Sequence, residues 1–90
     1  MARAMVDPAE LRRFARDLGR FNAELEGLVA SIKGRMATLE STWRDQEQRK
    51  FAEEFNATIK VLARFSEVSQ EHVHFLAQKA THIEAYLNQR

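Results

Sequence analysis

Apolar residues recur every three or four positions through two long stretches of this chain, from Leu11 to Leu39 and from Phe51 to Leu87. This spacing keeps successive apolar side chains on one face of an α-helix, because a helix turns once in about 3.6 residues. The segment between the two stretches holds the only Trp, Trp43. The pattern therefore predicts an all-α fold, in which two helices form an antiparallel hairpin with Trp43 at its tip.

The composition agrees with a small helical domain and excludes several kinds of function. The 90 residues contain three Gly, one Pro and no Cys, so neither a disulfide framework nor a thiolate metal site can form. Charged residues make up 30% of the chain but leave a net charge of only +1, which disfavours a general polyanion binder. No apolar run approaches the ~20 residues of a membrane span. Residues 1–6 are too short and too polar for a signal-peptide core. We expect a single domain, residues 1–90, with no cofactor, no metal site and no membrane insertion.

The first helix is predicted to cover about residues 8–39. Asp7 can cap it, Pro8 suits the first helical position, and Glu10 completes a capping box. Its apolar residues then alternate in threes and fours: Leu11, Phe14, Leu18, Phe21, Leu25, Leu28 and Ile32, continuing to Met36 and Leu39. Such a heptad seam requires a partner helix.

The second helix is predicted to cover about residues 47–88, after a turn at about 40–46. Two residues compete to cap it, Thr42 and Asp45. We favour Asp45, because that choice leaves Trp43 within the turn.

The second helix carries two apolar rows instead of one. The seam consists of Phe55, Ile59, Leu62, Ser66, Ser69, Val73, Leu76, Ala80, Ile83 and Leu87, and the flanking row of Phe51, Val61, Phe65, Val68, Phe75 and Tyr86. Together they span about 160° of the helix surface, wider than the ~100° stripe of an ordinary surface helix. One neighbouring helix cannot cover this arc. We therefore expect a second hairpin to pack on the first as a four-helix bundle, with a dimer face of Phe51, Val61, Phe65, Val68 and Phe75.

Two small polar residues, Ser66 and Ser69, interrupt the seam of the second helix. One interpretation is close approach of the helices, with each hydroxyl bonded to a carbonyl one turn back. The other is a polar lock on the helix register. We favour the first.

No catalytic or metal-binding constellation is evident. His72 and His74 point about 200° apart on a helix, so they cannot chelate one metal ion. No Ser or Thr is paired with a His and an acid at a defined spacing, so we expect no enzyme activity. A basic patch on the first helix, formed by Arg12, Arg13, Arg16 and Arg20, could meet phosphates. Because Asp17 and Glu24 are interleaved with it, we interpret this patch as a solvated surface.

Trp43 is followed eight residues later by Phe51, with Phe55 one turn beyond. In a Cys-free helical chain of this length, the layout resembles the WXG family of about one hundred residues, the early-secreted-antigen-like proteins associated with type VII secretion. The resemblance covers essentially the whole chain and implies hairpins that dimerise into four-helix bundles, with themselves or with a paralogue. The turn motif here is Trp43, Asp45 and Phe51. Asp45 stands where the family has Gly, and Asp accepts left-handed or capping conformations better than most residues.

The resemblance also bears on export. Many exported members carry a Tyr followed four residues later by an acid near the C-terminus. Here Tyr86 is followed at that position by Arg90. The candidate C-terminal signal lies in the last two helical turns and comprises Ala80, Glu84, Tyr86 and Leu87.

These observations favour a protein–protein interaction module similar to type VII secretion substrates or secretion-associated factors. Its expected partner is itself or a paralogue, with a secretion ATPase as a further candidate. It would be secreted without a Sec signal peptide, or remain cytoplasmic if export does not occur. One alternative is a cytoplasmic coiled-coil adaptor. Another is a nucleic-acid-associated regulator that uses the face from Arg12 to Arg20, but we expect no nucleic-acid partner.

Overall fold

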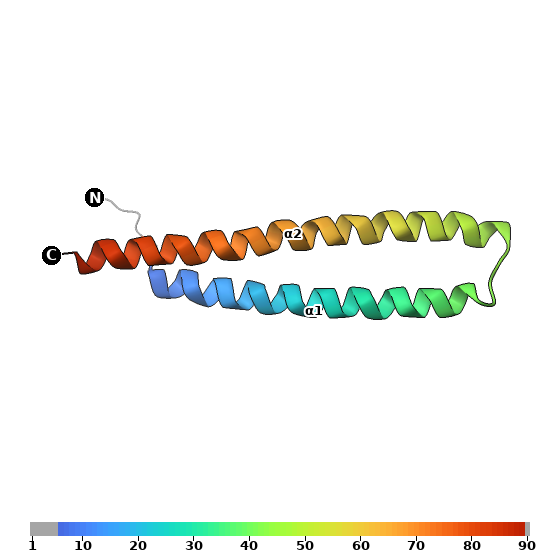
Figure 1. The fold of residues 1–90 in the computed structure, drawn as a ribbon, viewed down its shortest axis with the longest axis horizontal. Helices are drawn as coiled ribbons and strands as arrows, with labels where there is room; N and C mark the ends of the chain where they lie inside the picture. The colour runs from blue at the N-terminus through green and yellow to red at the C-terminus, as the bar shows by residue number, and fades with distance from the viewer. Residues whose placement is uncertain (1–5, 90) are drawn as a thin grey trace.

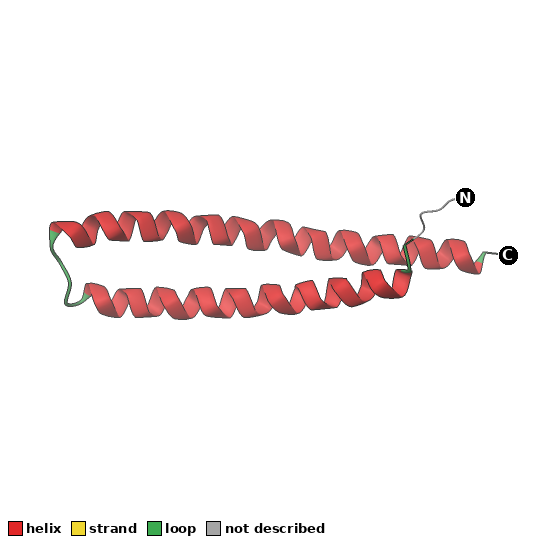
Figure 2. Cartoon of the chain, turned by 180° about the vertical axis from the view of Figure 1, so that it is seen from behind, coloured by secondary structure: helices red, strands yellow, loops and turns green. Residues whose placement is uncertain are grey.

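The computed structural model describes residues 6–89, which form two antiparallel helices (Figure 1). Helix α1 spans Pro8–Glu40 and helix α2 spans Gln46–Asn88. No strand occurs in the described part of the chain. The start of α1 and the end of α2 lie at the same end of the hairpin, opposite the connecting turn, and α2 continues past the start of α1 (Figure 2). The fold is the predicted helical hairpin.

The start of α1 follows local sequence signals. The Asp7 carboxylate accepts a hydrogen bond of 2.9 Å from the amide of Ala9, and Pro8 occupies the first helical position. The expected capping box is wrong, because the Glu10 carboxylate lies 3.1 Å from the guanidinium of Arg13 instead of reaching back to the Asp7 amide. A single side chain therefore caps this helix.

The most deeply buried residues of the contact between α1 and α2 are mostly small or polar. The buried residues are Ala15, Asn22 and Met36 of α1 with Gln48, Ser66, Ser69 and Ala80 of α2. The seam of α2 thus faces α1, and its two serines lie at the contact. Their expected bonds to carbonyls one turn back are not formed. The Ser66 hydroxyl donates across the interface to the Glu26 carboxylate at 3.1 Å.

The predicted seam of α1 is divided between two surfaces. Leu11, Leu18 and Leu25 are partly buried, whereas Phe14 and its equivalents further along the seam are exposed. The exposed members are Phe14, Phe21, Leu28, Ile32 and Leu39. The reason is that α1 meets α2 along a strip offset from the predicted seam, in which small residues allow close helix approach. Apolar residues spaced alternately by three and four positions do not show which of two adjacent strips faces the partner helix.

The hairpin lacks a core of its own. Among the described residues, no large side chain is fully buried. The radius of gyration is 20.2 Å, compared with about 12 Å for a compact domain of this length. The accessible surface of 7145 Å² exceeds the roughly 5,400 Å² of a compact monomer of 10.4 kDa. Neither described helix combines the length and apolarity that crossing a membrane requires.

Candidate functional site: an apolar face and a tryptophan turn

One side of the hairpin exposes aromatic and aliphatic side chains from both helices. We define the apolar face as Phe14, Phe21, Leu28 and Ile32 of α1 with Val61, Phe65, Val68 and Phe75 of α2. Val61 and Phe75 are 66% and 60% exposed, and Val68 is half-buried. The residues of α1 were not predicted for this surface, because they were assigned to the seam inside the hairpin. Phe51, also predicted here, is exposed next to the turn.

Contacts across the two helices join these residues into one surface. The rings of Phe21 and Phe65 meet edge to face, with centroids 6.2 Å apart. Phe14 and Phe75 line an open groove of about 520 Å³ between the helices. A second groove of about 460 Å³ is lined by Leu28 and its apolar neighbours. The apolar face therefore runs along much of the hairpin and includes two open grooves.

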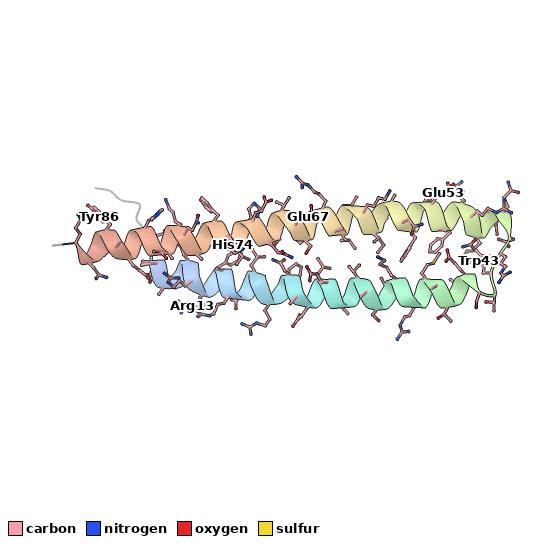
Figure 3. The ribbon with its side chains drawn as sticks, in the orientation of Figure 1. Arg13, Trp43, Glu53, Glu67, His74 and Tyr86 are labelled. Atoms are coloured by element: carbon pink, nitrogen blue, oxygen red, sulfur yellow. The ribbon has the colours of Figure 1, made fainter. Side chains whose placement is uncertain are left out.

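Charged and amide side chains lie outside the apolar face. Glu26 and Gln70 line a cleft on the side away from the grooves of the apolar face. Glu53 and Glu67 extend from α2 on the side away from α1 (Figure 3).

The turn is held by one aromatic cluster. The indole of Trp43 is half-buried and contacts the ring of Phe51, with centroids 5.7 Å apart. Phe51 stacks in turn on Phe55 at 6.1 Å. The side-chain amide of Gln48 donates to the Glu40 carboxylate at 3.1 Å, which ties the start of α2 to the end of α1. Trp43 lies at the tip of the hairpin (Figure 3).

Asp45 acts as the N-cap of α2. Its carboxylate accepts a hydrogen bond of 2.9 Å from the amide of Gln48. Its φ of −87° is in the extended region, and none of the described residues has a positive φ. Asp45 rather than Thr42 thus caps the helix, as favoured from the sequence. The turn does not use the left-handed conformation that Gly favours.

The four residues of the candidate C-terminal signal lie in different environments. Ala80 is 0% exposed, because it packs in the α1–α2 contact as its place in the seam predicts. Glu84 is bound to α1. Tyr86 and Leu87 are 68% and 49% exposed, beyond the start of α1 (Figure 3). Of these four residues, Tyr86 and Leu87 are the most exposed and make no described contact with α1.

An ion pair joins the beginning of α1 to the end of α2. The Arg12 guanidinium donates to both oxygens of Glu84, at 2.9 and 2.7 Å, and to the Thr81 hydroxyl at 2.9 Å. The hydrogen bond from Arg12 lowers the pKa of Glu84 below its usual value. The same bond raises the pKa of Arg12. This bridge is the last polar contact between the helices before α2 extends alone.

The remaining candidates do not form a site. Arg12, Arg13 and Arg20 of the basic patch each pair with an acid. No group of three or more potential metal ligands occurs in the described part of the chain. Such pairing is typical of a solvated helix face.

The comparison with known families decides what kind of hairpin this is. The family described as "Proteins of 100 residues with WXG", WXG100, matches residues 3–86. The chain belongs to the WXG100 family. Its Trp43-Arg44-Asp45 turn occupies the place of the Trp-x-Gly motif, with the capping carboxylate of Asp45 at the position of Gly.

Solved structures of another protein share the fold. The chain is similar to selenomethionine-labelled EsxB, a secreted protein from Bacillus anthracis str. Sterne, with 23% identity and a TM-score of 0.81 over 98% of this chain and 100% of that one. Wild-type EsxB gives 23% identity and a TM-score of 0.78, over 90% of this chain and 87% of that one. No curated protein matches the sequence. The WXG100 hairpin is thus shared with a secreted protein.

Proposed function

We propose that this WXG100 protein is a type VII secretion substrate or secretion-associated factor, without enzymatic activity, that acts as a dimer of hairpins. The single observation that carries the proposal is the apolar face on a hairpin without its own core. Contiguous exposed apolar surfaces of this kind mark interaction sites on soluble proteins. A second copy supplies a surface of matching length and chemistry, and the pair forms a four-helix bundle.

Export is supported by the family and by the similar structures of a secreted protein. A hairpin with Tyr86 and Leu87 projecting from one end offers the secretion machinery an accessible helical segment. The cytoplasmic adaptor remains the competing function, since it would use the same apolar face.

The oligomeric state tests the proposed dimer. Light scattering coupled to size-exclusion chromatography at micromolar concentration is expected to give about twice the chain mass of 10.4 kDa. A folded monomer at this concentration would contradict the proposed bundle. An insoluble chain that becomes soluble on co-expression with a paralogue would replace the homodimer by a heterodimer.

A pair of matched substitutions tests which side of the hairpin is used. Phe65→Glu places a charge in the apolar face and is expected to weaken dimerisation at least tenfold, because the charge would have to be buried without a partner. Ala63→Glu adds the same charge on the polar side and should leave the dissociation constant within about twofold. Analytical ultracentrifugation measures both. Equal effects of the two substitutions would show that the apolar face is not the dimer contact.

Export is tested by comparing culture medium from wild-type host cells with medium from cells that lack the secretion ATPase. The protein is expected in the medium only when the ATPase is present, with a cytoplasmic marker as the control for lysis. If the protein stays inside the cells in both cases, it is not a secretion substrate, and the cytoplasmic adaptor becomes the proposed function.

A further inference from the structure

A group of polar residues interrupts the α1–α2 contact midway along the hairpin. Asn22 and Ser69 are each only 3% exposed. Within the described hairpin, neither the side-chain amide of Asn22 nor the hydroxyl of Ser69 has a hydrogen-bond partner. Leaving buried polar groups in this state is unfavourable, so their presence in the middle of the α1–α2 contact requires a reason.

One turn further along α1, Glu26 completes the group. Its Oε2 accepts hydrogen bonds from the Ser66 hydroxyl at 3.1 Å and from the Gln70 amide at 2.7 Å. Gln70 also donates to the Ser66 hydroxyl at 3.3 Å. These bonds fix which residues of α1 and α2 lie opposite each other along the hairpin axis. We call Asn22, Glu26, Ser66, Ser69 and Gln70 the polar layer.

We infer that the polar layer determines which strip of α1 packs against α2 and in which register. Apolar packing is non-directional, and α1 carries two neighbouring apolar strips that could each face α2. Only the observed pairing brings the polar residues of both helices to the same height. Buried polar residues at single seam positions are known to select register in coiled coils at a cost in stability.

The competing pairings bury polar groups against apolar ones. A slip of α1 by one heptad moves Asn22 to the height of Leu62 or Leu76, and it moves the Glu26 carboxylate away from Ser66. Rotating α1 to use its Phe21 strip places phenyl rings against the two serines. Both alternatives lose the bonds to Glu26 and keep the burial of the serine hydroxyls, so they are disfavoured.

The register in turn sets the composition of the apolar face. It places the Phe21 ring in contact with Phe65, and Phe14 beside the same groove as Phe75. A hairpin paired in another register would present these four rings separately. The polar layer thus acts inside one hairpin and is independent of whether the protein is exported.

The test uses the full chain with the polar layer disrupted by Asn22→Leu together with Ser66→Ala. These changes remove the buried amide of α1 and the hydroxyl that binds Glu26 and Gln70. Because the chain has no Cys, Lys33→Cys and Gln78→Cys introduce spin labels at two exposed positions on different helices without competing thiols. The labels are about 30 Å apart along the hairpin axis, from a rise of 1.5 Å per residue, and a heptad slip changes that separation by about 10 Å. Labelled protein is diluted with excess unlabelled protein so that pulsed electron resonance reports distances within one hairpin.

The labelled protein with an unmodified polar layer is expected to give one narrow distribution of distances between the two labels. The apolar double variant should stay helical by circular dichroism and show a second or broadened distance. Met36→Leu, which exchanges one buried apolar residue of the same contact for another, is the matched control and should keep the narrow distribution. If the double variant does not fold, Ser66→Ala alone is measured in the same way. A single narrow distance in a folded layer variant would overturn the inference.

Discussion

At the scale of single residues, Trp43 is better described as a support for the turn than as a core residue. It is half-buried and its ring contact is with Phe51, itself exposed at the hairpin tip. We expect Trp43→Ala to lower the free energy of unfolding by about 2 kcal/mol, less than the 3–5 kcal/mol of a fully buried aromatic residue. Urea unfolding at fixed protein concentration measures this, with Trp43→Phe as the control that retains a ring. Unchanged stability in Trp43→Ala would indicate that the indole serves a partner.

Asp45 offers a second test of the turn, because its role as a cap and its place in the family motif make different predictions. Because Asp45 is an N-cap with a φ of −87°, its substitution by Ala should lower the free energy of unfolding by about 1 kcal/mol. Substitution by Asn should change it little. Asp45→Gly, which restores the family residue, should cost only a few tenths of a kcal/mol. Chemical denaturation of the three variants provides the values. A gain in stability with Gly would mean that the turn requires a positive φ in solution.

At the scale of the helices, the sequence was informative where a local signal determines the outcome. Asp7 and Asp45 were identified as caps because capping depends on neighbouring residues alone. The division of the α1 seam was not foreseen. Ala15 and Asn22 carry the helix contact, but an Ala and an Asn do not stand out in a search for large apolar residues. Which of two adjacent strips is buried depends on the shape of the partner helix, and apolar periodicity does not contain that information.

The bridge between Arg12 and Glu84 predicts a specific dependence of stability on pH. Because the pKa of Glu84 is lowered in the folded state, its contribution is complete at pH values above its ordinary pKa of 4.5 and is lost as the pH falls through the lowered value. The pKa of Arg12 is raised, so its contribution is complete across the whole acidic and neutral range and does not change with pH there. We therefore expect Glu84→Gln to melt below the wild-type protein at pH 7, with the difference shrinking toward pH 3.

The control for this effect is Glu53→Gln, which removes an exposed carboxylate that points away from α1 (Figure 3). Its melting temperature should follow that of the wild-type protein across the same pH range. A difference for Glu84→Gln that does not change with pH would show that the carboxylate contributes by packing and not by its charge.

At the scale of the whole molecule, the hairpin divides into a body of two paired helices and a projecting end. The last polar contact between the helices is at Glu84, and the next exposed apolar residues are Tyr86 and Leu87, where α2 continues alone (Figure 1). Deleting residues 85–90 should therefore abolish export while dimer mass and helical content remain. The measurements are the amount of protein in the culture medium, light scattering and circular dichroism. Ala80 is buried in the hairpin, so a deletion that starts at residue 80 should instead reduce both export and dimer formation. Loss of dimerisation together with export on removal of residues 85–90 would show that this end belongs to the bundle and is not a separate recognition element.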